Sequence, residues 1–303
     1  MKFSLSLSYT DPHELIDIAR AAEDHGFHGI AMGEHVLHPV NIESDYPYRP
    51  TPDGPRSIDH QAPLLNLWTT AGAIAGATEK LHFMTSLYLL NLRHPLVSAN
   101  AAATLVGISN NRFEFGVGTG WMKEEYDELG VPWDGRGKRF DEALDIMQKA
   151  WHGVEEPHHG DHYSFQAMGT NPRPVTEVPL YFGGHTLVAM RRAANRGDGW
   201  ICAPKPELVR EQVRTISELR KANGRDDRPF QFCAMLKLPN ESAIVELVQV
   251  GVDHVIVSCP WRPDLGRAMS TSDKLAALVD LAKTMRSIAA KTATASVAIP
   301  AAV

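Results

Sequence analysis

Cysteine is scarce in this sequence and widely spread. The three cysteines, Cys202, Cys233 and Cys259, are odd in number, and no C-x-x-C pair occurs. A disulfide framework and a paired-cysteine metal or redox motif are therefore not expected. Thiols placed in this way are explained as small buried apolar side chains, and they favour a protein of the reducing cytoplasm.

The sequence also lacks an excess of positive charge and any long apolar run. Its formal net charge is −6, so we expect no basic surface that attracts nucleic acid. No apolar stretch approaches the ~18 residues of a membrane-spanning helix, and we expect no membrane partner. The opening residues, MKFSLSLSYT, lack the apolar core and the cleavage site of a signal peptide and instead predict a strand.

Motifs for two kinds of chemistry are missing as well. No Gly-x-Ser-x-Gly sequence is present, and nothing points to a hydrolytic triad. HHGDH (158–162) brings three histidines and an aspartate together, but their spacing matches no zinc motif. We expect this segment to form an exposed hairpin, and the sequence predicts no metal site.

What the sequence does contain is a regular alternation of strand-like and helix-like stretches. In one helical stretch, Phe140, Ala143, Leu144, Met147 and Trp151 recur at the spacing of a single buried face. Eight short apolar runs have the character of strands, at residues 2–7, 28–33, 81–86, 112–118, 179–184, 198–203, 229–236 and 253–258. Eight strands alternating with helices predict a (β/α)8 TIM barrel, with a doubly wound open sheet as the alternative.

The domain organisation follows from this count. We expect one barrel domain over residues 1–288, with insertions at the C-terminal face of the strands. The polar, proline-rich stretch 38–62 is too long for a simple connection and is expected to form a lid or binding loop. Residues 289–303 are rich in alanine, threonine and serine, and we expect a flexible tail there.

Glu34 and His35 are the first candidates for catalysis. They follow the second predicted strand and precede the long loop, and barrel enzymes place their chemistry at the C-terminal ends of strands. Because histidine exchanges protons near neutral pH, His35 is a candidate proton donor or acceptor. Glu34 is then either the residue that orients His35 or the partner in a buried ion pair.

FEFGVGTGW (113–121) looks at first like a dinucleotide-binding fingerprint. That fingerprint is G-x-G-x-x-G opening directly into a helix, whereas Trp121 follows Gly120 here and the segment up to Arg136 predicts a loop. The glycines either turn the chain or leave a flat backbone surface on which a planar ring can lie. In the second case, Gly118 and Gly120 are the candidate contacts of the ring.

YFGGHT (181–186) is the better candidate for binding a phosphate. Gly183 and Gly184 end a predicted strand, and Thr186 begins the next predicted helix. Backbone N–H groups at the start of a helix attract anions, and the Thr186 hydroxyl can add a hydrogen bond. The alternative is an ordinary turn between a strand and a helix.

Several of these motifs, taken in order, resemble the luciferase-like superfamily. They are GVGTGW, EEYDELGVP (124–132), RGKRFDEALDIMQKAW (136–151) and PLYFGGHTLVAMRRAANRGDGW (179–200). The resemblance covers about residues 1–260 and is strongest to the deazaflavin-dependent oxidoreductases of mycobacterial type. It implies a (β/α)8 barrel, in agreement with the strand count, a cofactor at the C-terminal mouth that is FMN or coenzyme F-420, and a homodimer.

The resemblance also implies roles for particular residues. Ser86 and Leu87 match a bulge that carries a non-prolyl cis peptide bond behind the cofactor ring, and His35 matches the histidine near the reactive ring carbon. The other implied cofactor contacts are the loop at Gly118 and Gly120 and the phosphate-binding turn at Gly183, Gly184 and Thr186.

One position departs from the family pattern. The sugar-phosphate dehydrogenases of this family carry an acidic residue directly after GVGTG, where this sequence has Trp121. Glu124 and Glu125 come later and are expected to face elsewhere. The departure argues against sugar-phosphate oxidation and indicates a more apolar substrate pocket, with Trp121 as one wall and Tyr126 as another.

The resemblance therefore implies an oxidoreductase that transfers a hydride between coenzyme F-420 and a small organic substrate. An FMN-dependent monooxygenase that uses oxygen is the first alternative, because the choice of cofactor decides the type of reaction. A deazaflavin- or flavin-binding protein without turnover is the second, because fold does not fix function.

Overall fold

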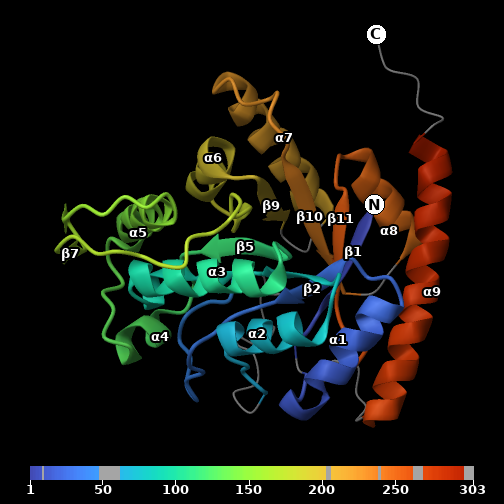
Figure 1. The fold of residues 1–303 in the computed structure, drawn as a ribbon. Coiled ribbons are helices and arrows are strands. Elements are labelled where there is room, and N and C mark those ends of the chain that lie inside the picture. The colour runs from blue at the N-terminus through green and yellow to red at the C-terminus, as the bar shows by residue number, and fades with distance from the viewer. Residues whose placement is uncertain (9, 48–61, 203–205, 238–239, 262–268, 297–303) are drawn as a thin grey trace.

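The fold is a closed barrel of eight parallel strands surrounded by helices (Figure 1). The computed structural model describes residues 1–8, 10–47, 62–202, 206–237, 240–261 and 269–296. The barrel strands are β1 (Lys2–Ser6), β2 (Gly29–Met32), β3 (His82–Thr85), β5 (Phe113–Gly118), β8 (Leu180–Gly183), β9 (Gly199–Cys202), β10 (Gln231–Leu236) and β11 (His254–Val257). All eight lie within the predicted runs, and the predicted (β/α)8 TIM barrel is confirmed.

The hydrogen-bonded neighbours show how the barrel closes. β1 pairs with β2 on one side and with β11 on the other. β3 pairs with β5, which joins the two halves of the sheet, so no strand of the barrel has a free edge. A short additional strand, β4 (Tyr88–Leu89), continues from β3 and pairs with the C-terminal half of β5.

The helices pack on the outside of the barrel. They are α1 (Leu15–Asp24), α2 (Leu67–Ala77), α3 (Pro95–Ser109), α4 (Lys123–Glu128), α5 (Arg136–Trp151), α6 (Leu187–Arg196), α7 (Pro206–Ala222), α8 (Glu241–Gln249) and α9 (Thr271–Ser296). The predicted buried face of α5 is confirmed for Phe140, Ala143, Leu144 and Met147, while Trp151 is half-buried. Two short 3-10 helices, η1 (Pro12–Glu14) and η2 (Leu90–Leu92), lie in the connections.

Some boundaries differ from those predicted. α3 ends at Ser109, and its C-cap Asn110 has a left-handed φ of 53°. α9 extends to Ser296 and so covers part of the predicted tail, and residues 297–303 lie outside the described residues. The predicted loop after Trp121 contains α4. The predicted hairpin at 158–165 is confirmed as the antiparallel pair β6 (His158–His159) and β7 (Ser164–Phe165).

Two of the apolar clusters belong to the barrel itself. The larger core lies between the strands and the surrounding helices. A smaller cluster draws one side chain from each of six barrel strands and consists of Ala31, Met84, Tyr181, Ile201, Cys233 and Ile256, with Leu87 packed against it. Leu87 follows β3, so this inner cluster reaches the C-terminal end of the barrel, where the sequence predicts the active site.

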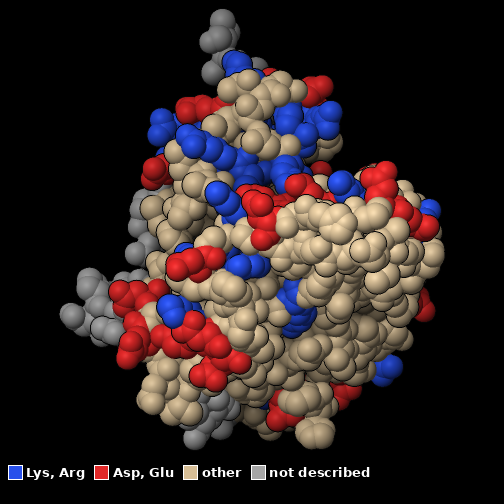
Figure 2. All heavy atoms as spheres, turned by 90° about the vertical axis from the view of Figure 1, so that its left-hand side faces the viewer, with Lys and Arg blue, Asp and Glu red and all other residues tan. Residues whose placement is uncertain are grey.

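Two further features concern the surface. On the face that is at the left in Figure 1, basic and acidic side chains form separate groups rather than one continuous patch (Figure 2). Within the described part of the chain, no helix combines the length and the apolar character needed to cross a membrane.

Candidate active site

His35 is held at the C-terminal mouth of the barrel by Glu125. Its Nδ1 lies 3.0 Å from Oε2 of Glu125, whose side chain is 1% exposed against 10% for His35. The other oxygen of Glu125 accepts the backbone N–H groups of Val36 and Leu37. Three N–H groups therefore converge on one acceptor carboxylate, which fixes the proton on Nδ1 and leaves Nε2 as the nitrogen that exchanges a proton.

Glu124 fastens the next part of the same loop. Its Oε1 accepts the N–H groups of Glu43 and Ser44 at 2.7 and 2.8 Å. The hydroxyl of Ser44 in turn accepts the N–H of Lys123 at 3.0 Å, at the start of α4. The described beginning of the predicted lid, residues 38–47, is thus docked on α4, while residues 48–61 lie outside the described residues.

This pair of glutamates is the main feature that sequence reasoning missed. Glu124 and Glu125 were expected to face away from the site, yet both bind the loop that carries His35. The signal available in the sequence was two adjacent acidic residues at the start of a helix directly after a strand end. That signal was hidden because α4 has only 6 residues and was predicted as a loop.

Trp121 lies beside His35. The two rings meet edge to face with centroids 5.7 Å apart. On another side, the ring of Tyr46 contacts Trp121 at a centroid distance of 5.1 Å. The half-buried indole thus lies between His35 and Tyr46, which both belong to the segment after β2. It places an apolar surface next to the imidazole.

Glu34 contacts Arg93 and Leu89. Its Oε1 accepts a hydrogen bond from Nη2 of Arg93 at 2.7 Å, and its Oε2 accepts the N–H of Leu89 at 2.8 Å. Burial raises the pKa of Glu34, and the charge of Arg93 opposes that rise. Of the two roles considered for Glu34, these contacts match the buried ion pair, and the carboxylate that contacts His35 is that of Glu125.

The peptide bond between Ser86 and Leu87 is cis, as the family resemblance implied. The side chain of Leu87 then packs toward the glycines of two neighbouring strands. A Cβ on Gly118 would lie 2.8 Å from Cδ1 of Leu87, and a Cβ on Gly183 would lie 2.9 Å from the same atom. These two glycines therefore make room for Leu87, which corrects the expectation that Gly118 itself offers the flat surface.

Gly120 serves the turn that follows. Its φ of 79° lies in the left-handed region, which disfavours any residue with a Cβ. Behind it stands Tyr126, which is fully buried and donates its hydroxyl to the backbone carbonyl of Thr119. Burial raises the pKa of Tyr126 to about 12, so its hydroxyl remains protonated at neutral pH. Tyr126 supports the turn from below and is not the exposed pocket wall that the sequence predicted.

The predicted phosphate turn begins α6. Thr186 is the N-cap, and its hydroxyl accepts the N–H of Ala189 at 3.2 Å. Gly184 has a φ of 137°, and no acidic residue occupies the first turn of the helix. The positive end of the helix dipole is therefore uncompensated by a carboxylate, which is the condition that favours an anion.

Together these segments bring the ends of β2, β3, β5 and β8 into one mouth. His35, Trp121, Leu87 and the Gly183–Gly184 turn come from four different strand ends, as a barrel enzyme requires. Residues 203–205 after β9, 238–239 after β10 and 262–268 after β11 lie outside the described residues.

Comparison with known families and proteins gives consistent results. The model of the luciferase-like monooxygenase family matches residues 2–239. An uncharacterised protein of Mycobacterium tuberculosis is 32% identical over 259 residues, which are 85% of this chain and 88% of that protein. The F-420-dependent glucose-6-phosphate dehydrogenase of Beutenbergia cavernae is 34% identical over 223 residues, which are 72% of this chain and 60% of the dehydrogenase.

Solved structures show the same fold. A monooxygenase from Streptomyces bottropensis superposes with a TM-score of 0.75 over 95% of this chain and 99% of its own, at 16% identity. An F-420-dependent secondary alcohol dehydrogenase in complex with an F-420–acetone adduct gives a TM-score of 0.72 over 94% of this chain and 99% of its own, also at 16% identity.

Proposed function

The chain belongs to the luciferase-like monooxygenase family, and we propose that it is an oxidoreductase that transfers a hydride between coenzyme F-420 and a small organic substrate. The observation that carries the proposal is the His35–Glu125 pair at the mouth of the barrel. The ordered family motifs and the relative named as an F-420-dependent dehydrogenase support the choice of cofactor.

The described residues fit a deazaflavin at this mouth. Leu87, over the inner apolar cluster, offers an apolar floor for a ring, and Gly118 and Gly120 border it. Gly183, Gly184 and the start of α6 with Thr186 would hold the phosphate, since that helix terminus carries no competing acid. When bound, coenzyme F-420 supplies a ring carbon that accepts or delivers a hydride.

The chain's own contribution is to move one proton and to orient the substrate. Glu125 holds Nδ1–H of His35, so Nε2 accepts the proton from a substrate hydroxyl in oxidation, or returns it to a carbonyl oxygen in reduction. Trp121 and Tyr46 cover one side of this region and limit the access of water to the imidazole. A proton donor placed in this way typically contributes about 100- to 10,000-fold to the rate.

Trp121 also bears on the class of substrate. An indole beside the reacting histidine favours an apolar group and offers no acceptor for a sugar hydroxyl. We therefore propose a small alcohol or carbonyl compound with an apolar substituent rather than a sugar phosphate.

A fluorescence titration of the cofactor-free protein tests the first step. We expect saturable binding of coenzyme F-420 at micromolar concentration and weaker binding of FMN. The matched variant His35→Gln should bind coenzyme F-420 as the wild type does, because His35 acts on the substrate proton. Absence of F-420 binding to a folded protein at these concentrations would remove the proposal.

An FMN-dependent monooxygenase is the second candidate, favoured by the family name and by the fold shared with a monooxygenase. The two candidates differ in their need for oxygen. Oxygen consumption with reduced FMN and a small apolar substrate would favour the monooxygenase, whereas turnover with coenzyme F-420 under nitrogen would favour the dehydrogenase.

A further inference from the structure

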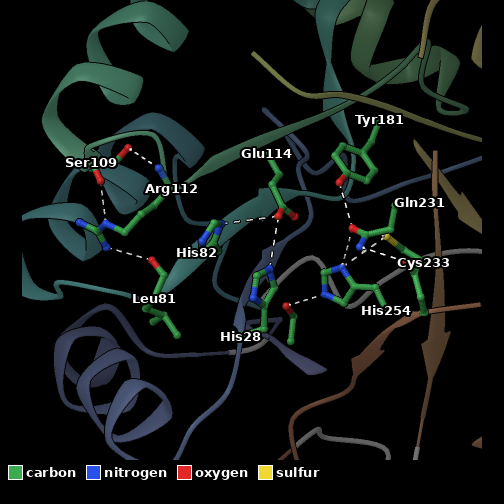
Figure 3. Close-up of polar contacts among 12 residues, drawn as sticks. His28, Leu81, His82, Ser109, Arg112, Glu114, Tyr181, Gln231, Cys233 and His254 are labelled. Carbon is green, nitrogen blue, oxygen red and sulfur yellow. Dashed lines mark hydrogen bonds and ion pairs between the residues drawn. The ribbon is translucent and has the colours of Figure 1, made fainter. Parts of the chain in front are cut away.

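A second polar cluster lies at the opposite, N-terminal end of the barrel (Figure 3). His28 directly precedes β2, His82 is the first residue of β3, and Glu114 is the second residue of β5. These three strands are hydrogen-bonded neighbours in the barrel. Their side chains therefore meet at one end of the barrel, although 86 positions separate His28 from Glu114 in sequence.

The three side chains point their ligating atoms at one another. Nε2 of His28 lies 3.4 Å from Oε1 of Glu114, and Nδ1 of His82 lies 3.6 Å from the same oxygen. All three ligand atoms fall within 4.8 Å of one another. The imidazole rings of His28 and His82 are stacked, with centroids 4.4 Å apart, and one nitrogen of each ring lies near Oε1 of Glu114.

The contact between His28 and Glu114 is a long hydrogen bond and that between His82 and Glu114 is an ion pair, and both separations also suit ligands that share an ion. Hydrogen bonds between nitrogen and oxygen are typically about 2.7 to 3.2 Å long. In a tetrahedral zinc site with bonds of about 2.0 to 2.2 Å, neighbouring ligand atoms lie about 3.3 to 3.6 Å apart. In addition, Nδ1 of His82 is buried and makes no hydrogen bond within the described residues.

The surrounding side chains support the cluster without competing for it. His254 packs edge to face against His28 at a centroid distance of 5.3 Å. Its Nε2 is bonded to the hydroxyl of Ser4 at 2.8 Å, and its Nδ1 faces Oε1 of Gln231 at 3.3 Å. Both nitrogens of His254 are thus occupied, which leaves His28, His82 and Glu114 as the available ligands.

We propose that His28, His82 and Glu114 form a binding site for a divalent transition-metal ion, with Zn²⁺ as the best fit. Two imidazoles and one carboxylate are a ligand set that zinc accepts, and a fourth position remains for water. His82 is 36% exposed, so solvent can reach the site from the N-terminal face of the barrel. The ion would tie together the starts of β2, β3 and β5, far from the proposed cofactor.

Cobalt(II) titration of the metal-free protein tests this assignment. We expect one Co²⁺ per chain, with the visible absorption of a four-coordinate ion, and displacement of that ion by Zn²⁺. Glu114→Gln and His82→Gln should each weaken binding at least ~100-fold, because each removes a direct ligand. Far-UV circular dichroism checks that each variant is folded. If Glu114→Gln does not fold, the test of the metal site rests on His82→Gln, which replaces a partly exposed side chain.

The chain provides a matched control in the hairpin β6–β7. His159→Gln removes a histidine from the other histidine-rich segment, HHGDH, and should leave Co²⁺ binding unchanged. Zn²⁺ should also raise the midpoint of thermal unfolding of the wild type but not of His82→Gln, since an ion bound only to the folded state stabilises it. The proposal is overturned if the wild type shows no saturable binding, if binding survives both ligand variants, or if only His159→Gln abolishes it.

Discussion

The carboxylate of Glu125 collects three N–H groups from the end of β2, and one of them belongs to the imidazole of His35. In Glu125→Gln, the amide can no longer hold all three donors, so the imidazole loses its fixed tautomer. We expect kcat to fall about 10- to 100-fold, as is usual when an orienting partner is lost. The dissociation constant of coenzyme F-420 should change little, because Glu125 contacts the loop and not the predicted cofactor residues.

Glu124→Gln is the matched control for that prediction. It makes the same change in charge one residue earlier, and its amide oxygen can still accept the N–H groups of Glu43 and Ser44. Steady-state kinetics should show a smaller loss of kcat than in Glu125→Gln. Equal losses in the two variants would mean that charge at the start of α4, rather than orientation of His35, sets the rate.

Leu87 and the glycines around it give a prediction about packing. The three nearest atoms to a Cβ on Gly118 all belong to the Leu87 side chain, the nearest at 2.8 Å. Gly118→Ala should therefore destabilise the protein by about 1 to 3 kcal/mol, the usual effect of overpacking. Urea unfolding should show a smaller cost for the same change in a Leu87→Ala background, because the clash is then absent.

Gly72→Ala serves as the control for glycine replacement in general. Gly72 lies within α2, and nothing stands within 4 Å of the position of a new Cβ. This variant should gain about 0.5 to 1 kcal/mol, since alanine restricts the unfolded chain more than glycine does. If Gly118→Ala is as well tolerated as Gly72→Ala, Leu87 is not packed against Gly118 in solution.

At the scale of elements, the connection between η1 and α9 makes a pH-dependent prediction. Oε2 of Glu14 lies 2.5 Å from Nζ of Lys274, and Oε1 accepts the hydroxyl of Thr271 at 2.7 Å. Burial raises the pKa of Glu14, but these two hydrogen bonds outweigh it and the pKa lies below its ordinary value. The pair's stabilisation is therefore complete above an ordinary glutamate pKa of about 4.3 and is lost as the pH falls toward the folded value.

The measurement compares the unfolding free energies of the wild type and Lys274→Met across pH. Their difference should be constant near neutral pH and shrink below about pH 4.3, as Glu14 takes up a proton. Lys283→Met is the control, because its partner Asp280 is 77% exposed and the pair lies within α9 itself. A difference that does not change with pH would contradict the assigned partner of Glu14.

The elements also show what could be predicted from the sequence. The strands were predictable because a buried parallel strand is a short apolar run, and all eight runs contain one. The acidic helix α4 was not, because six residues give too little periodicity to recognise. The contacts of Glu14 with Lys274 and Thr271 were not predictable either, because these residues belong to a helix more than 250 positions away.

The same limit applies to the site. Strand ends identified His35 and Trp121, since the fold class alone fixes where strand ends meet. The glutamate that contacts His35 could not be identified from the sequence. Glu34 is its neighbour in the chain, whereas Glu125 lies 90 positions away and reaches His35 only in the folded protein. The cluster of His28, His82 and Glu114 was likewise invisible, since its members come from three separate strands.

For the whole molecule, the resemblance predicts a homodimer, and α3 offers a suitable face. This helix carries no charged residue, and Val97 and Ile108 point outward with 61% and 59% of their surface exposed. We expect light scattering to give the mass of two chains. Val97→Glu together with Ile108→Lys should shift the protein toward one chain, whereas a wild-type monomer at micromolar concentration would contradict the prediction.

Hydride transfer that depends on coenzyme F-420 and needs no oxygen is the central claim for the molecule as a whole. The most direct measurement is the absorbance of coenzyme F-420 under nitrogen, with the protein and a panel of small alcohols and carbonyl compounds. We predict turnover with at least one apolar member, slowed at least ~100-fold in His35→Gln with unchanged cofactor affinity. No change of F-420 absorbance with any member, together with oxygen-dependent turnover on reduced FMN, would contradict the account.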